Sequence, residues 1–142
     1  MKLVTTDVAH PWYCDVLGHM TTRFFLAMFD DASYHFIHSM FGWCGGQDDK
    51  GELALADVRH VIEYKAEVSA GDLLEIRAEL LKIGSKSFTF AYEMTNLRNG
   101  EIASTLEVVC VLFDLKARRA VVIPDALRSA AEKQLQGGSG ED

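Results

Sequence analysis

The chain has 142 residues, enough for one domain with a substantial hydrophobic core. Its 49% hydrophobic and 25% charged residues, with only two prolines, argue against a disordered protein. The formal net charge of -7 argues against non-specific nucleic-acid binding, which depends on neutralising phosphates with Lys and Arg. We therefore expect a single domain at residues 1–136, followed by a disordered tail at 137–142.

The cysteines and the hydropathy pattern indicate the compartment. Three cysteines are too few, and odd in number, for a disulfide framework. The N-terminal residues lack the apolar stretch of a signal peptide, and no run of eighteen apolar residues predicts a membrane span. We expect a reduced, cytoplasmic protein without membrane or nucleic-acid partners.

The first third of the chain predicts a strand, a turn and a long helix. Residues 4–13 are rich in β-branched and aromatic residues, and Pro11 suits a strand end or edge. Residues 14–20 resemble a turn, and Thr21 and Thr22 are good helix N-caps. Residues 23–41 contain neither Gly nor Pro, which predicts one helix.

The expected helix is apolar over most of its surface. One stripe repeats at three- and four-residue steps: Phe25, Met28, Phe29, Ala32, Phe36 and Met40. Three further residues, Phe24, Leu26 and Ile37, widen it. The opposite side carries Arg23, Asp30, Asp31, Tyr34, His35 and His38. Such a helix should be largely enclosed by the rest of the fold.

Alternating apolar and polar residues predict that the remainder is mostly strand. The expected strands are 57–68, 74–80, 88–95, 101–114 and 120–123, with a short helix at 125–136. One long helix followed by about five antiparallel strands is an α+β arrangement. A curved sheet wrapped around the helix would cover more of its apolar surface than a flat sheet.

Asp15 is the strongest candidate for catalysis. It lies just before a helix N-terminus, where unpaired backbone amides and the positive end of the helix dipole gather. A carboxylate nucleophile or base, with amides that polarise a carbonyl oxygen, is sufficient for acyl transfer. The structural alternative is that Asp15 only holds a turn through an Asx-type hydrogen bond.

Other reactive side chains are weaker candidates. Asp30, Asp31, His35 and His38 share helix faces and suggest a metal or acid–base group, but a solvated helix surface is the simpler explanation. Cys14 is a conceivable nucleophile with His10 or His19 as base, although adjacent strand residues such as Cys14 and Asp15 point to opposite faces. His10 with Cys14 is a weak zinc signal. Four aromatic residues suit an acyl pocket or, more simply, the core: Phe24, Phe36, Phe41 and Trp43.

The order of motifs resembles one known family. An Asp15-x-x-Gly18-His19-Met20 element precedes an aromatic-rich helix that reaches Phe29-Asp30-Asp31-Ala32. A strand with Tyr64, the turn before Asp72 and the strand start Lys86-Ser87-Phe88 follow. The chain thereby resembles the 4-hydroxybenzoyl-CoA thioesterase family of hotdog-fold acyl-CoA thioesterases.

The resemblance implies a hotdog fold, a homodimer or homotetramer, and a pocket between protomers. By position, Asp15 matches the catalytic carboxylate, and the backbone amide at Thr22 would polarise the thioester carbonyl. His19 would orient Asp15 or donate to the substrate. The remaining positions expected around the substrate are Gly18, Phe25, Lys82, Lys86 and Ser87, with the lysines near the phosphates of CoA.

We therefore predict hydrolysis of an acyl-CoA to a free acid and CoA, with no metal or organic cofactor. A hotdog-fold hydratase or dehydratase, with His19 and an acid acting on a β-hydroxyacyl thioester, is one alternative. A non-catalytic acyl-CoA-binding module is the other.

Overall fold

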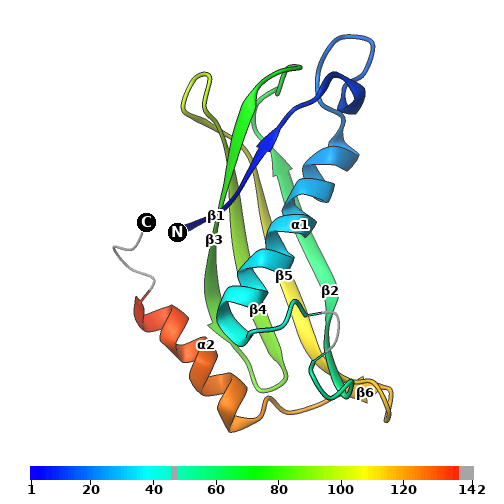
Figure 1. Ribbon diagram of the computed structural model, residues 1–142, viewed down its shortest axis with the longest axis vertical. Coiled ribbons are helices and arrows are strands. Elements are labelled where there is room, and N and C mark those ends of the chain that lie inside the picture. The colour runs from blue at the N-terminus through cyan, green and yellow to red at the C-terminus, as the bar shows by residue number, and fades with distance from the viewer. Residues whose placement is uncertain (46–47, 138–142) are drawn as a thin grey trace.

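The computed structural model describes residues 1–45 and 48–137, and these form one curved antiparallel sheet with a long helix across it (Figure 1). The strands, in chain order, are β1 (Lys2–Val8), β2 (Leu53–Tyr64), β3 (Leu73–Ile83), β4 (Ser87–Asn96), β5 (Glu101–Asp114) and β6 (Arg119–Ala120). Their spatial order is β1-β3-β4-β5-β2, and β6 pairs with β5. The long helix α1 (Thr22–Phe41) precedes β2, and α2 (Asp125–Gly137) ends the described chain.

Helix α1 forms where the sequence predicts it and buries the predicted stripe. All six stripe residues are buried, together with Ile37. The helix ends at Gly42, whose φ of 81° is a left-handed conformation that favours glycine, and whose amide bonds to the carbonyl of His38. The enclosure is less complete than expected, because Leu26 remains 37% exposed on the outer side.

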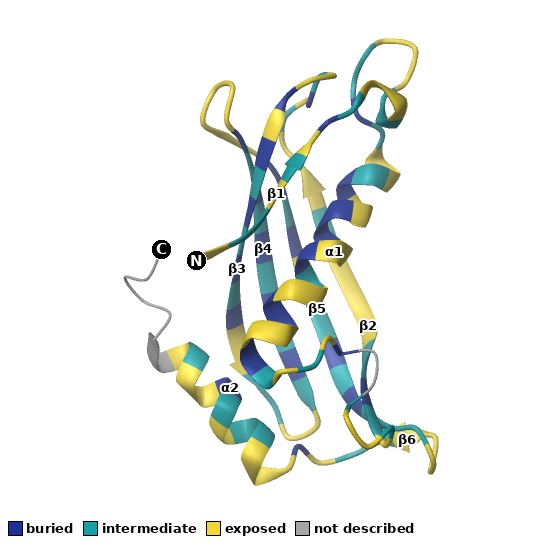
Figure 2. Cartoon of the chain, viewed as in Figure 1, coloured by how far each residue is buried: buried dark blue, intermediate teal, exposed yellow. Residues whose placement is uncertain are grey.

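The core lies between α1 and the central strands. Alternate residues of β4 are buried from Phe88 to Asn96 (Figure 2). The aromatic ones contact phenylalanine rings of α1. Phe36 of α1 makes edge-to-face contacts with Phe90 and Tyr92 at centroid distances of 5.8 and 6.3 Å. The α+β hotdog architecture, a central helix wrapped by a curved sheet, is thereby confirmed.

Several strand predictions are wrong in their bounds. Strand β3 continues to Ile83, three residues beyond the expected end. Strand β2 spans 53–64 rather than 57–68. It lies at the sheet edge beside β5, and although Ala54 is buried and Leu55 and Ile62 pack against the core, most of the strand is exposed. Strand β1 ends at Val8, and Pro11–Tyr13 form a short 3-10 helix instead of continuing it. The last predicted strand, 120–123, shrinks to Arg119–Ala120. The amide of Val121 still bonds to Leu112 of β5, but that of Ile123 bonds to Ser85 in the β3–β4 turn, where the chain leaves β5.

The C-terminal helix α2 was expected and packs beside β3 (Figure 1). Arg128 of α2 donates to the carbonyl of Gly84, in the turn between β3 and β4, at 2.7 Å. Most of the expected disordered tail, residues 138–142, lies outside the described residues. No helix within 1–45 or 48–137 is long and apolar enough to cross a membrane.

Candidate active site

The N-terminal loop (residues 9–20) connects β1 to α1 and carries several predicted site residues. It lies against the β2–β3 turn (residues 68–72), to which both of its ends are hydrogen-bonded. The amide of Met20 bonds to the carbonyl of Val68 at 2.7 Å, and that of Gly71 bonds to the carbonyl of Ala9 at 2.7 Å. The loop is therefore fixed by backbone contacts rather than left free in solvent.

Asp15 heads a tight turn within this loop. Its Oδ1 accepts hydrogen bonds from the amides of Leu17 at 2.9 Å and His19 at 3.3 Å. Gly18 has a φ of 79°, which favours glycine, and its amide bonds back to the carbonyl of Asp15 at 3.0 Å. The Asx-type turn weighed from the sequence is thus present, and the exposed carboxylate is held in a defined orientation.

An open pocket of about 300 Å³ lies beside this turn, at the start of α1. Thr22 and Phe25 line it from the helix, as expected for substrate-binding residues. Tyr64 lines the other side and meets the ring of Phe25 edge-to-face at 5.3 Å. Met20, Lys65, Ala66 and Glu67 complete the lining. Asp15 is not a lining residue, and its turn reaches the lining through His19, which contacts Glu67.

The N-terminus of α1 faces this pocket uncapped. The N-cap residue Thr21 makes no side-chain capping bond, and across residues 1–45 and 48–137 its buried hydroxyl has no hydrogen-bond partner. Thr22, the first helical residue, lines the pocket. The first amides of a helix are donors without partners inside the helix, and the helix dipole favours negative charge there. This end of α1 can therefore stabilise an oxyanion.

His19 connects the loop to the pocket. Its Nε2 lies 3.3 Å from Oε2 of Glu67, one of the lining residues. The contact is possible because His19 and Ser69 form an antiparallel bridge, which brings residue 67 alongside the histidine. The structure thus gathers Asp15, Gly18, His19, Thr22 and Phe25 at one end of the molecule.

The remaining predicted residues lie at the other end of the same chain. Lys82, Lys86 and Ser87 are at or beside the β3–β4 hairpin, whereas the pocket is beside the residues that precede β3. At a rise of about 3.3 Å per residue, the length of β3 places Lys82 roughly 30 Å from the pocket. One chain alone therefore does not combine these residues with Asp15.

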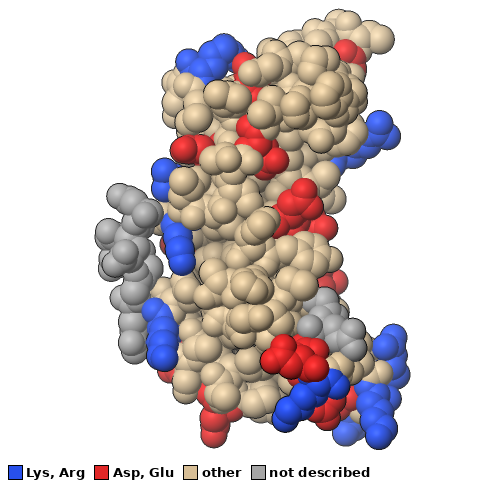
Figure 3. Space-filling view, viewed as in Figure 1, with Lys and Arg blue, Asp and Glu red and all other residues tan. Residues whose placement is uncertain are grey.

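Few positively charged side chains lie near the pocket. On the face shown in Figure 3, Lys and Arg lie mainly at the margins, and uncharged and acidic side chains occupy the middle. Lys65 is the cation that lines the pocket, and its side chain is half exposed.

Comparison with known proteins identifies the family. Residues 9–131 match the model of the Thioesterase-like superfamily. This chain belongs to that superfamily. The match includes α1 and the whole pocket described above, so the prediction of a thioester hydrolase is confirmed at the level of the family.

Individual relatives have low sequence identity to this chain but match it over most of its length. The chain is 22% identical over 127 residues to long-chain acyl-CoA thioesterase FadM of Escherichia coli, covering 88% of this chain and 93% of the relative. It superposes with a TM-score of 0.82 on protein SAV2348 of Staphylococcus aureus, solved in complex with CoA, at 20% identity over 95% of this chain and 85% of that one. A 1,4-dihydroxy-2-naphthoyl-CoA thioesterase from Synechocystis gives a TM-score of 0.76 at 20% identity, over 89% of this chain and 93% of that one.

The other chemical candidates find little support in this thioesterase-like chain. Partial burial, followed by the carboxylates of Asp15 and Asp72, raises the pKa of the Cys14 thiol, which makes it a poor nucleophile. Among the described residues, no three His, Cys, Asp or Glu side chains are arranged to hold a metal ion. The four candidate acyl-pocket aromatics do not line this pocket; Phe36 and Phe41, for example, contact the core rings of Phe90 and Phe88 on β4.

Five lining residues were missed as site residues: Met20 in the N-terminal loop, and the run Tyr64, Lys65, Ala66 and Glu67. The sequence assigned this run to the alternating faces of a strand reaching residue 68. That alternation breaks because the amides of Lys65 and Ala66 both bond to the carbonyl of Ala103. The alternation of apolar and charged residues from Tyr64 to Glu67 gives no sign of this irregularity, because it depends on a hydrogen-bond acceptor in another strand.

Proposed function

We propose that the chain is an acyl-CoA thioesterase whose active site is the pocket beside Asp15. The observation that carries this proposal is an uncapped helix N-terminus facing a pocket next to a fixed, exposed carboxylate. Membership of the superfamily and the likeness to FadM support an acyl-CoA substrate. The apolar walls formed by Phe25, Tyr64 and Met20 suit an acyl group.

In this proposal the helix amides at Thr22 stabilise the oxyanion that develops on the thioester carbonyl. Asp15 either removes a proton from a water molecule that attacks the carbonyl carbon, or attacks that carbon itself to form a mixed anhydride. In both routes the carbon–sulfur bond breaks, the CoA thiolate leaves and takes up a proton, and water supplies the oxygen of the free acid.

The site is proposed to be completed by a second copy of the chain. Strand β2 is an unpaired sheet edge, and Val58, Val61 and Tyr64 on it are 59%, 40% and 47% exposed. Antiparallel pairing of two β2 strands would cover these side chains and place opposite ends of the two protomers side by side. Lys82, Lys86 and Ser87 would then serve the partner's pocket, near the phosphates of CoA.

The test is release of free thiol from a panel of acyl-CoA thioesters, beginning with long-chain ones because FadM is named for them. Asp15→Asn should lower kcat at least about a hundredfold, since it removes the base or nucleophile. Asp114→Asn is the matched control, because Asp114 also accepts two amide bonds in a turn, from Lys116 and Ala117, but does not line the pocket. Equal activity of the native chain and Asp15→Asn would refute the role of Asp15.

The His19–Glu67 pair keeps one alternative in view, a hydratase or dehydratase acting on a β-hydroxyacyl thioester. Incubation with an enoyl-CoA separates the two activities. Addition of water without release of CoA would favour the hydratase, whereas thiol release favours the thioesterase. Faster hydrolysis of acyl carrier protein thioesters than of acyl-CoA would change the proposed carrier of the acyl group but not the proposed reaction.

A further inference from the structure

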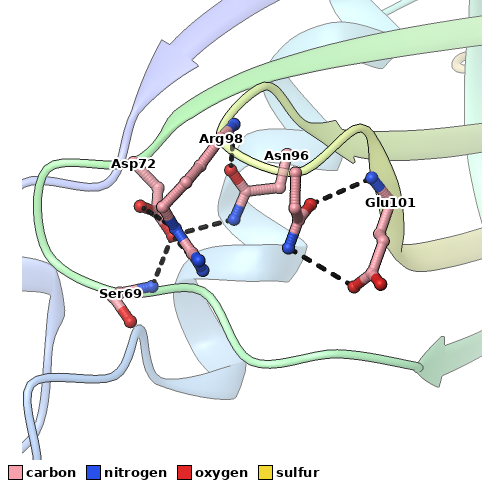
Figure 4. Close-up of polar contacts among 6 residues, drawn as sticks. Ser69, Asp72, Asn96, Arg98 and Glu101 are labelled. Carbon is pink, nitrogen blue, oxygen red and sulfur yellow. Dashed lines mark hydrogen bonds and ion pairs between the residues drawn. The ribbon is translucent and has the colours of Figure 1, made fainter.

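Asp72 is a buried carboxylate that the proposed reaction does not use. It is 6% exposed and is the last residue of the β2–β3 turn, just before β3. Its Oδ2 accepts bonds from the amide of Ser69 and from Nδ2 of Asn96, both at 2.8 Å. Arg98 completes the group, with Nε 3.0 Å from Oδ1 and Nη2 3.4 Å from Oδ2 (Figure 4).

These contacts hold the turn against which the N-terminal loop is built. The carbonyl of Asp72 accepts from the amide of Ala9 at 2.9 Å, at the start of the loop. The amide of Ala70 bonds to the carbonyl of Gly18 at 3.1 Å, just after the Asp15 turn. A shift of the turn therefore moves both the Asp15 carboxylate and the entry into α1.

Arg98 comes from a different part of the chain, the β4–β5 hairpin, and its planar fork fixes the direction of the Asp72 carboxylate. Its side chain is 56% exposed and lines no part of the pocket. Asp72 keeps the bonds from Ser69 and Asn96 when Arg98 is removed, so the fold survives this loss. What is lost is the lateral restraint on the turn.

We propose that Asp72 and Arg98 are positioning residues for the thioesterase site, acting through the β2–β3 turn on Asp15 and on the start of α1. This inference rests on the proposed function for its catalytic consequence, but its structural step stands apart from it. Catalysis is sensitive to displacements of about 1 Å, which can cost up to about a hundredfold in rate, whereas binding of a long flexible substrate is less sensitive. Loss of the Asp72–Arg98 contact should therefore affect kcat more than KM.

Arg98→Ala is the decisive variant, and Arg77→Ala is its matched control. Arg77 also pairs with a carboxylate on the same sheet, Glu75 at 3.6 Å, but away from the loop. We expect Arg98→Ala to lower kcat about tenfold with KM changed less than about twofold, and Arg77→Ala to change neither. Arg98→Lys keeps the charge without the fork and should recover only part of the loss.

A second measurement does not depend on activity. Hydrogen exchange of the amides in residues 9–20 should be faster in Arg98→Ala than in Arg77→Ala and the native chain. If the native chain hydrolyses no thioester, the proposed function fails and exchange alone decides the positioning role. Unchanged exchange, or a kcat per folded molecule equal to the native value, would overturn the proposal.

Discussion

Strands β4 and β2 belong to the same sheet but differ in strand pairing and in the burial of their side chains. Strand β4 is paired on both sides, and every second residue from Phe88 to Asn96 is buried against α1. Strand β2 is paired on one side only, and from Asp57 to Val61 every residue is exposed. Strand β2 has the higher apolar content, with eight apolar residues of twelve against five of ten in β4, so the difference in burial comes from their places in the sheet and not from their composition.

The buried strands form the core, whereas the exposed edge strand borders the candidate site. The interior formed by β3, β4, β5 and α1 is closed within one chain, whereas the end of β2 supplies Tyr64 to an open pocket. An unpaired strand edge that exposes apolar side chains invites pairing with another strand. The chain therefore keeps its core complete and leaves its candidate site and its proposed dimer edge on the same strand.

The largest expected effect contrasts one residue from each strand. Phe90→Ala should lower the free energy of unfolding by about 3–5 kcal/mol, because Phe90 is 1% exposed and leaves a cavity beneath Phe36. Val61→Ala, at an exposed position of β2, should change it by no more than about 0.5 kcal/mol in the monomer. Urea unfolding at low protein concentration measures both values.

The same pair of variants also tests the proposed dimer. Val61→Ala should shift the midpoint of the monomer–dimer equilibrium to higher concentration in analytical ultracentrifugation, because it removes apolar surface from the proposed edge. If Val61→Ala destabilises the monomer as much as Phe90→Ala does, β2 is not an open edge and the contrast between the strands fails.

Replacing either of two carboxylates, Asp72 or Asp30, should change the free energy of unfolding by a smaller amount and in opposite directions. Burial opposes ionisation of Asp72, but hydrogen bonds from Arg98, Ser69 and Asn96 hold its pKa below 3.8. Beside the β2 edge, partial burial, then Asp57 and Asp31, raise the pKa of Asp30. At neutral pH, Asp72→Asn should cost about 1–3 kcal/mol, because the bonds of a buried charge are weakened, whereas Asp30→Asn should stabilise slightly.

The pH dependence gives the check. Asp72 binds protons less readily when folded, so its stabilising effect is present above pH 3.8 and is lost as the pH falls below that value. The stability difference between the native chain and Asp72→Asn should therefore disappear in acid. Asp30 behaves oppositely, since its raised pKa makes the folded chain gain stability as the carboxylate protonates. Thermal unfolding from neutral pH to pH 3 follows both, and parallel curves for all three proteins would contradict this assignment.

The sequence predicted the parts that depend on local periodicity and missed those that depend on neighbours. The α1 stripe and the end of the helix at Gly42 follow from spacing and backbone preference, and both were predicted correctly. The end of β2 at Tyr64 was not predictable, because Asp57–Val68 alternates well and the break comes from the bonds of the Lys65 and Ala66 amides to Ala103. Asp15, His19 and Thr22 came from a motif local in sequence, whereas Glu67 and Arg98 reach the site region by long-range pairing.

The smallest effect concerns the buried hydroxyl of Tyr92 on β4. Tyr92 is 1% exposed, and its hydroxyl has no hydrogen-bond partner among the described residues. Tyr92→Phe should leave the free energy of unfolding unchanged or raise it by up to about 1 kcal/mol, because an unpaired buried hydroxyl is costly. Tyr64→Phe on β2 is the control, since its side chain is half exposed.

Burial raises the pKa of Tyr92 far above its usual value of 10.0, so the folded chain holds this proton more tightly than the unfolded chain does. The native protein should therefore lose stability as the pH rises above 10, and Tyr92→Phe should lose less. A drop of more than about 1 kcal/mol at neutral pH in Tyr92→Phe would show that the hydroxyl has a partner, such as a buried water. In that case the interior would owe part of its stability to a polar contact, and the contrast with the open edge of β2 would be one of hydration as well as of packing.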